Sequence, residues 1–217
     1  MAQANGKAPN PWLTIPWEDY EGHMAHPTVS QTQFLSNVFR QALHQFQPES
    51  IAVLGCATGN GFEHIDPDVC RRVTAVDINP GYLDILQDRF QPTIPGLECI
   101  CEDVVTCDLR IGAYDLVHCA LIFEYLEPRI LIEKIRIWLR VDGILVVVLQ
   151  LPSAKVGNVS PTEFRSLERL NPIMKLVDPE YLKKELEESG FREIRAYRET
   201  LPSAKEFFIG HYRKRTL

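Results

Sequence analysis

The 217-residue sequence has no hydrophobic run long enough to cross a membrane and no apolar leader at its start. Its longest purely apolar run, Ile144 to Leu149, falls far short of the roughly 20 residues that a membrane helix needs. Residues 1–10 are polar and include Pro9, so they do not resemble a secretory signal peptide. We therefore expect a cytoplasmic protein with no membrane partner.

Basic residues are in deficit, with 23 Lys and Arg against 29 Asp and Glu and a formal charge of −6. Because neutralisation of phosphates favours a basic face, we do not expect a nucleic-acid partner. The six cysteines contain no C-x-x-C pair, and Cys99-x-Cys101 with Cys107 does not match a zinc-site spacing. We expect no metal site, and cysteines that pack as small hydrophobes in a reducing compartment.

Apolar residues make up 45% of the chain and charged residues 24%, which is typical of one soluble globular domain with a full core. Residues 1–27 are rich in Pro, Asn, Trp and Tyr without periodicity, which predicts an irregular N-terminal arm or lid. Residues 28–217 read as a single domain. Within that domain, the polar stretch 152–176 is a candidate cap for a substrate site.

Apolar runs alternate with helical patterns through the domain. Thr28 or Ser30 is expected to cap a first helix that Pro48 ends, and Asn79-Pro80, Glu127-Pro128 and Asp178-Pro179 open later ones. Gly143 is expected to separate a helix from the strand that follows it. The order predicts an α/β fold with a doubly wound, mostly parallel sheet and helices on both faces. The expected strands are 51–54, 73–78, 97–101, 114–120, 144–149, 191–197 and 206–212.

A glycine-rich loop follows the first expected strand, with Gly55, Gly59 and Gly61 at positions i, i+4 and i+6. Glycines allow the backbone to turn sharply and to approach a ligand without an obstructing Cβ. In a parallel sheet of this type, ligands bind outside the carboxyl ends of the strands, at the point where the strand order reverses. The loop is therefore the first candidate for a binding site.

Asp77 ends the next expected strand, about 20 residues after Gly55, where an acid can accept hydrogen bonds from a ribose diol. Asn79 is available to cap the following helix, so capping does not account for Asp77. The loop has Ala57 where a dinucleotide fingerprint needs its second glycine, and the sequence has no Gly-Lys-Ser/Thr phosphate loop. Together these features predict a nucleoside-containing ligand and disfavour NAD.

This arrangement resembles the class I S-adenosylmethionine-dependent methyltransferases over residues 51–151, and the order of elements extends the likeness to the C-terminus. The resemblance implies a Rossmann-like, seven-stranded sheet with an antiparallel last strand and S-adenosylmethionine as cofactor. Two positions depart from the family pattern: Val53 stands where an acid is frequent, and Ala57 replaces a glycine. The cofactor-binding residues that the resemblance implies are Gly55, Cys56, Ala57, Gly59, Asp77, Ile78, Asp103, Val104 and Cys119.

The acceptor side carries less information. The fourth strand lacks the Asn/Asp-Pro-Pro-Tyr/Phe signature of methylation on base or amide nitrogens, so the resemblance implies a small-molecule acceptor. Tyr20 and His23, in the aromatic stretch Trp17 to Met24, are the catalytic candidates, able to orient an acceptor or take its proton. The alternatives are a non-catalytic cofactor-binding module, an aminopropyl transferase, and an NAD-dependent enzyme on a similar scaffold.

Overall fold

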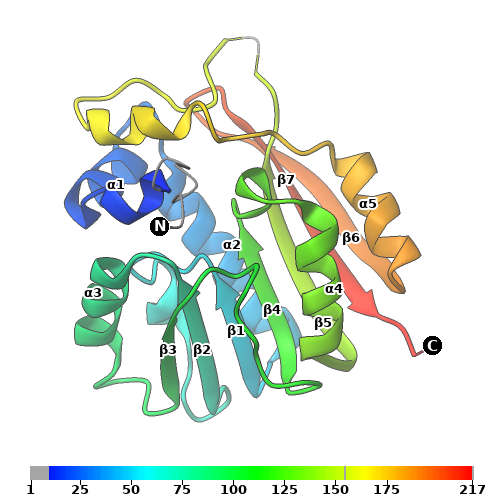
Figure 1. The fold of residues 1–217 in the computed structure, drawn as a ribbon. Helices are drawn as coiled ribbons and strands as arrows, with labels where there is room; N and C mark the ends of the chain where they lie inside the picture. Colours follow the sequence, from blue (N-terminus) through cyan, green and yellow to red (C-terminus); the bar gives the residue numbers. More distant parts are fainter. Residues whose placement is uncertain (1–9, 154, 217) are drawn as a thin grey trace, which may run out of the picture.

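The computed structural model describes residues 10–153 and 155–216 (Figure 1). The elements alternate between strands and helices along most of the chain. In the described part of the chain three helices precede the first strand, and two adjacent strands end the fold. In chain order the elements are η1 (Pro11–Thr14), α1 (Trp17–Ala25), α2 (Gln31–Phe46), β1 (Ser50–Leu54), η2 (Phe62–His64), β2 (Arg72–Asp77), α3 (Pro80–Phe90), β3 (Leu97–Cys101), β4 (Tyr114–Ala120), η3 (Phe123–Tyr125), α4 (Pro128–Trp138), β5 (Leu139–Gln150), η4 (Arg165–Leu170), α5 (Pro179–Glu188), β6 (Phe191–Thr200) and β7 (Glu206–Lys214).

The seven strands form one sheet in the order β3-β2-β1-β4-β5-β7-β6. The pairs from β3 to β5 are parallel, and β7 runs antiparallel to both β5 and β6. This confirms the predicted doubly wound sheet with an antiparallel last strand. The strand order reverses between β1 and β4, so the carboxyl ends of these strands mark the expected ligand site.

Helices cover both faces of the sheet, with α2 and α3 on one face and α4 and α5 on the other (Figure 1). Side chains of β1 alternate between the two cores: Ile51 and Val53 face the first pair of helices, and Ala52 and Leu54 face the second. The run Ile144 to Leu149 is buried throughout, as expected for a strand that is covered on both sides.

Local sequence signals account for most helix starts. The Asn79 side chain accepts a hydrogen bond from the Gly81 N–H, and the Asp178 side chain accepts one from the Glu180 N–H. The first of the expected caps is wrong in its chemistry. Ser30 precedes α2, but its backbone is left-handed and its hydroxyl donates to the Pro27 carbonyl, so it does not cap the helix.

The prediction of an irregular arm over residues 1–27 is wrong for its described part, because η1 and α1 lie there. Residues 1–9 of the expected arm lie outside the described residues. Trp17, Tyr20 and Met24 follow helical spacing, but a helix of nine residues with Gly22 inside it is too short for that pattern to stand out.

One further boundary differs from expectation. Strand β5 begins at Leu139, so Gly143 lies inside it instead of separating helix from strand, and the pairing with β4 is irregular nearby. Within the candidate cap 152–176, residues Arg165–Leu170 form the 3-10 helix η4. Among the described residues, no helix combines the length and apolarity needed to cross a membrane.

Candidate functional site

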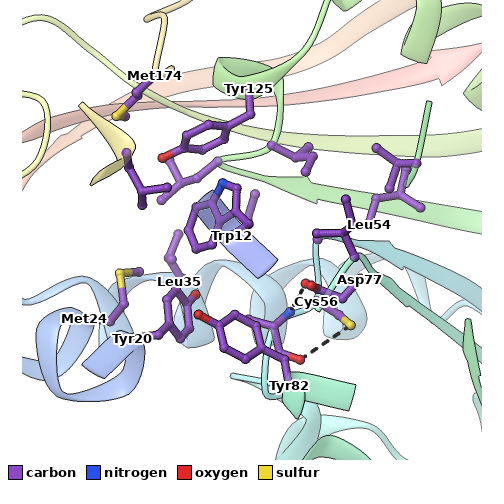
Figure 2. Close-up of a pocket in the computed structure, with 18 of the residues that line it drawn as sticks. Trp12, Tyr20, Met24, Leu35, Leu54, Cys56, Asp77, Tyr82, Tyr125 and Met174 are labelled. Atoms are coloured by element: carbon purple, nitrogen blue, oxygen red, sulfur yellow. Dashed lines mark hydrogen bonds between the residues drawn. The ribbon is translucent and has the colours of Figure 1, made fainter. Parts of the chain in front are cut away.

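A cavity of about 220 Å³ lies at the carboxyl ends of β1, β2, β4 and β5. Figure 2 shows the cavity with Trp12 near its centre, Tyr125 on one side of that ring and Tyr20 on the other. The wall away from the sheet comes from η1, α1 and the segment around η4. The sheet edge that the sequence predicted therefore carries a cavity, and elements from distant parts of the chain cover it.

Asp77 forms one end of the cavity and is 8% exposed. Its Oδ2 accepts the Ala57 N–H at 2.9 Å, and its Oδ1 accepts the Asn79 N–H at 2.9 Å. Burial raises the pKa of Asp77, whereas the backbone hydrogen bonds from Asn79 and Ala57 act in the opposite direction. Because each carboxylate oxygen has a second lone pair, Asp77 can hold the loop after β1 and still accept hydrogen bonds from a ligand.

The loop between β1 and η2 reaches its shape without a glycine at its middle position. Ala57 adopts a left-handed backbone with φ of 45°, which accounts for the glycine that the family pattern favours there. Gly59 also has a positive φ, of 86°, but a Cβ at this position would lie 2.9 Å from Cε2 of Phe90 on α3. Gly59 therefore serves the packing of the loop on α3.

The structure brings most of the predicted cofactor residues together and leaves two apart. Gly59 does not line the cavity, and Cys119 is fully buried in the core between the sheet and α4. Asp103 lies at the cavity edge with an exposed side chain, and its Oδ1 accepts the Val105 N–H at 2.9 Å. The predicted residues that line the cavity are Gly55, Cys56, Ala57, Asp77, Ile78, Asp103 and Val104.

Aromatic rings form the middle of the cavity. The Trp12 ring meets Tyr125 edge-on with a centroid separation of 5.2 Å, and meets Tyr20 edge-on at 6.1 Å. Tyr20 in turn lies 5.4 Å from Tyr82 (Figure 2). Burial, with the nearby charge of Asp77, raises the pKa of Tyr20, so its hydroxyl stays protonated and can donate a hydrogen bond.

Helix α1 is attached to both sides of the cavity. Glu21 accepts a hydrogen bond from the Thr58 hydroxyl at 2.6 Å and pairs with Arg89 of α3, which ties α1 to the loop after β1. Toward η4, a Cβ at Gly22 would lie 2.2 Å from Cζ of Phe164. Only glycine therefore permits this contact between α1 and the segment before η4.

His23 projects from α1, is 5% exposed and lines the cavity. Its Nδ1 lies 3.0 Å from the Thr162 hydroxyl oxygen, within hydrogen-bonding distance. Burial, together with the positive charges of Lys205 and His26, lowers the pKa of His23 to about 4. The imidazole is therefore neutral at pH 7.

A polar group closes the end of the cavity opposite Asp77. Gln150 ends β5, Lys205 precedes β7, and both side chains line the cavity with Asn158. The Lys205 ammonium donates to the Asn158 carbonyl at 2.7 Å and to Gln150 Oε1 at 3.2 Å. The Gln150 backbone N–H donates to the buried Glu124 carboxylate at 2.8 Å, which fixes the end of β5.

Sequence reasoning missed several residues that line the cavity. Gln150 was within reach of the rule that sites lie at strand ends, and Tyr82 follows the predicted helix cap closely. Trp12 and Lys205 carry no local signal, because their place depends on how distant segments pack. Among the described residues, no cluster of three or more His, Cys, Asp or Glu side chains is arranged to hold a metal ion.

Comparison with known proteins places this site in a family context. A family model described as a methyltransferase domain matches residues 52–147, which run from β1 into β5 and contain the Asp77 end of the cavity. No curated protein matched the sequence. Residues 52–147 therefore resemble a methyltransferase domain, and the strand order is that of the Rossmann-like methyltransferase fold.

Solved structures with this fold include proteins with different named activities. The N-methyltransferase NodS from Bradyrhizobium japonicum WM9, in complex with S-adenosyl-L-homocysteine, is 17% identical, with 91% of this chain and 97% of that chain covered and a TM-score of 0.67. Geranyl diphosphate C-methyltransferase from Streptomyces coelicolor A3(2) is 11% identical, with 86% and 82% covered and a TM-score of 0.67. The [4+2]-cyclase SpnF is 15% identical, with 85% and 81% covered and a TM-score of 0.68.

The residues at the Asp77 end fit S-adenosylmethionine, the cofactor that the sequence resemblance implies. The Asp77 carboxylate keeps free lone pairs for a ribose diol. The Tyr82 hydroxyl is buried among the cavity-lining residues and has no hydrogen-bond partner within residues 10–153 and 155–216. A buried polar group without a partner is costly, and a bound polar ligand would supply one.

Proposed function

We propose that this chain transfers a methyl group from S-adenosylmethionine to a small molecule held between the donor end and the Gln150 end of the cavity. The observation that carries the proposal is the continuity of the cavity, which joins Asp77 at the end of β2 to Gln150 at the end of β5. One continuous cavity thus offers both a cofactor end and a second, separately lined end.

The walls of the second end favour a small acceptor. Trp12 and Tyr125 flank it, and α1 and the segment around η4 cover it. These covering elements are joined by the hydrogen bond that the Ser166 hydroxyl donates to Asp19 at 2.5 Å. An acceptor that fits beneath this cover must be small, because a folded protein or a duplex cannot pass under it. We assign the role of lid to α1 and the role of acceptor cap to segment 152–176.

The cofactor supplies an activated methyl group, and the protein supplies alignment. Holding two reactants in line is worth up to about 7–11 kcal/mol in well-oriented systems. Asp77 fixes the donor end, and the aromatic rings around Trp12 exclude water and confine the acceptor to one direction of approach. The proposal therefore needs no obligatory catalytic dyad.

His23 and Tyr20 serve orientation in this proposal. A pKa of about 4 makes the His23 imidazole a weak base, but a neutral imidazole can accept a hydrogen bond from an acceptor O–H or N–H. Tyr20 keeps its proton and lies between Trp12 and Tyr82, close enough to Asp77 for that negative charge to raise the pKa of Tyr20. Its hydroxyl is thus placed to donate to the donor and to align it with the acceptor.

Two measurements test the function. Isothermal titration with S-adenosylhomocysteine and with NAD checks the cofactor. Incubation with methyl-labelled S-adenosylmethionine and a metabolite extract, followed by mass spectrometry, checks the acceptor. We expect S-adenosylhomocysteine to bind, NAD not to bind, and the label to appear in a small molecule. With the Asp77→Ala variant the label should fall at S-adenosylmethionine concentrations that do not saturate the variant.

The outcomes separate the proposal from its rivals. Binding of S-adenosylhomocysteine with label found only in protein or nucleic acid would contradict a small-molecule acceptor. Binding without any labelled product would favour a non-catalytic module, or another reaction on this fold, as the name of the cyclase SpnF illustrates for that protein. Preferential binding of NAD would overturn the cofactor assignment.

A further inference from the structure

Lys205 is a buried cation that has no acidic partner among the described residues. Lys205 is 2% exposed, and its ammonium contacts the neutral oxygens of Asn158 and Gln150. No ion pair within residues 10–153 and 155–216 involves it. Burial lowers the pKa of Lys205 to about 8, which still leaves most of the side chain protonated at pH 7. A buried charge of this kind calls for a counter-ion.

The repeated pentapeptide Leu-Pro-Ser-Ala-Lys shows that this burial is specific to one copy. The two copies, 151–155 and 201–205, lie next to each other, because the Leu151 N–H donates to the Glu206 carbonyl at 2.8 Å. Lys155 ends the first copy and is exposed, whereas Lys205 ends the second and lines the cavity. Loop composition is therefore the same in both, and the tertiary position alone distinguishes the two lysines.

Lys205 lies at the acceptor end. The carboxylates that line the cavity, Asp77, Glu102 and Asp103, follow β2 and β3, on the far side of the β1–β4 reversal. Lys205 instead precedes β7, which pairs with β5, and it lies close enough to His23 to lower the pKa of that imidazole. Among the residues that line the cavity in the described part of the chain, Lys205 is the one lysine or arginine.

We propose that Lys205 is the recognition site for an anionic group on the methyl acceptor, which makes a small, aromatic or aliphatic organic acid the substrate class. The inference rests on the proposed function, whose acceptor it describes. The anion would take the place of a counter-ion beside the ammonium, while Gln150 and Asn158 hold the ammonium in position. The apolar part would lie against Trp12 and Tyr125.

Two other roles for Lys205 make different predictions. If Lys205 bound the carboxylate of the cofactor, its removal would lower the affinity for S-adenosylhomocysteine. If Lys205 only tied Asn158 to the end of β5, its removal would lower stability without any effect that depends on the charge of an added ligand. Matched acids and amides distinguish these roles, because each pair differs in charge and hardly in shape.

The test uses isothermal titration of the whole protein, with and without saturating S-adenosylhomocysteine. The probes are benzoate with benzamide, and hexanoate with hexanamide. The variants are Lys205→Met, which keeps the length and apolar stem of the side chain, and Lys155→Met, the same change in the exposed copy of the pentapeptide. The affinity of each variant for S-adenosylhomocysteine is measured in parallel.

We expect at least one acid to bind the wild type more tightly than its amide. Lys205→Met should lower the affinity for that acid about tenfold or more, as expected for hydrogen bonds to a charged group. It should leave the affinities for the amide and for S-adenosylhomocysteine unchanged. Lys155→Met should change nothing. Equal affinity for acid and amide in the wild type would overturn the proposal even if Lys205→Met failed to fold. A parallel loss of affinity for S-adenosylhomocysteine would show that Lys205 binds the methyl donor instead of the acceptor.

The failures of the two proposals are distinguishable. The proposed function fails if S-adenosylhomocysteine does not bind or no small molecule is labelled, and neither result depends on benzoate or hexanoate. The anion site fails if the acids show no preference over the amides, whether or not a labelled product exists. A labelled product without an acidic group would also contradict the anion site and leave the methyltransferase function standing.

Discussion

The two ends of the cavity are built in different ways. The donor end consists of strand ends and the loops that follow them, and its key contacts join Asp77 to Ala57 and Asn79 through backbone groups. The acceptor end consists of side chains from η1, α1, the segment around η4 and the entry of β7, which meet only in the folded chain. The donor end is therefore a property of the sheet, and the acceptor end is a property of what covers it.

This difference explains how one fold can carry different reactions. In the proposed function, a sheet edge that presents a loop and an acid can bind the same donor beneath different covering elements. Changes in the covering elements alter the acceptor without disturbing the strands, because loops tolerate variation that cores do not. Specificity should accordingly respond to substitutions in α1, segment 152–176 and Lys205, whereas donor affinity should respond to substitutions at the strand ends.

The largest effect is expected at Gly59 in the loop after β1, and the quantity affected is the free energy of unfolding. Gly59→Val forces a side chain into a left-handed backbone, which costs about 1–2 kcal/mol. It also drives the side chain into Phe90 and Leu86 of α3, and such overpacking costs about 1–3 kcal/mol more. We expect denaturant unfolding to show a combined loss near 3 kcal/mol. A fully stable variant that fails to bind the cofactor would place Gly59 against the donor instead.

Gly112 is the matched control for Gly59. It has a similar positive φ of 61°, but a Cβ at this position meets nothing within 4 Å among the described atoms. Gly112→Val should therefore show the backbone cost alone. The difference between the two variants measures how tightly the loop after β1 is packed on α3.

The next effect concerns donor affinity. Asp77→Ala removes hydrogen bonds to a charged group, so we expect it to lower the affinity for S-adenosylhomocysteine by about 1.5–3 kcal/mol, measured by titration calorimetry. The exposed carboxylate of Asp103 is the control, because a solvated group contributes less. Asp103→Ala should lower the affinity for S-adenosylhomocysteine by less than Asp77→Ala does.

Asp77 also supports the loop, and a second variant separates the two roles. Asp77→Asn keeps one carbonyl oxygen for the Ala57 or Asn79 N–H but removes the charge. If its unfolding free energy matches the wild type while cofactor affinity falls, the carboxylate acts on the ligand. Unchanged affinity in a folded Asp77→Ala protein would contradict the assignment of Asp77 to the cofactor.

The sequence predicted most of the residues that line the Asp77 end of the cavity because their signals are local. An apolar run followed by glycines, and a second run that ends in Asp77 before the Asn79 cap, each indicate structure within a dozen residues. Hydrogen bonding between neighbouring strands then brings the two signals to the same edge of the sheet. Ala57 shows the limit of this reasoning, because its left-handed backbone could not be inferred from an alanine.

The acceptor end was not predictable in the same way. The nine residues of α1 give too few turns for periodicity to register, and the reason for Gly22 lies in Phe164, more than a hundred residues later. Lys155 and Lys205 end identical pentapeptides but differ in burial. Such positions are fixed by contacts between segments far apart in the chain, which a single sequence does not display.

The smallest effect tests the connection between the two ends. Glu21 ties α1 to Thr58 in the donor loop and to Arg89, and its side chain is about one-third exposed. A partly exposed ion pair contributes roughly 0.2–1 kcal/mol, so Glu21→Gln should open α1 only slightly more often. Limited proteolysis between Asp19 and Met24 should then be up to about fivefold faster than in the wild type, because cleavage follows the open population.

Glu18→Gln is the control for this change, since Glu18 is an exposed acid on the same helix without an ion pair in the described structure. It should leave the cleavage rate of α1 unchanged. S-adenosylhomocysteine should slow cleavage of the wild type, because a ligand under α1 stabilises the loop after β1, to which Glu21 is bound through Thr58. In Glu21→Gln this protection should weaken, since the connection from Thr58 to α1 has lost its charge. Cleavage at the same rate with and without ligand in the wild type would show that α1 is a fixed wall, and Tyr20 and His23 would then shape the acceptor site without opening it.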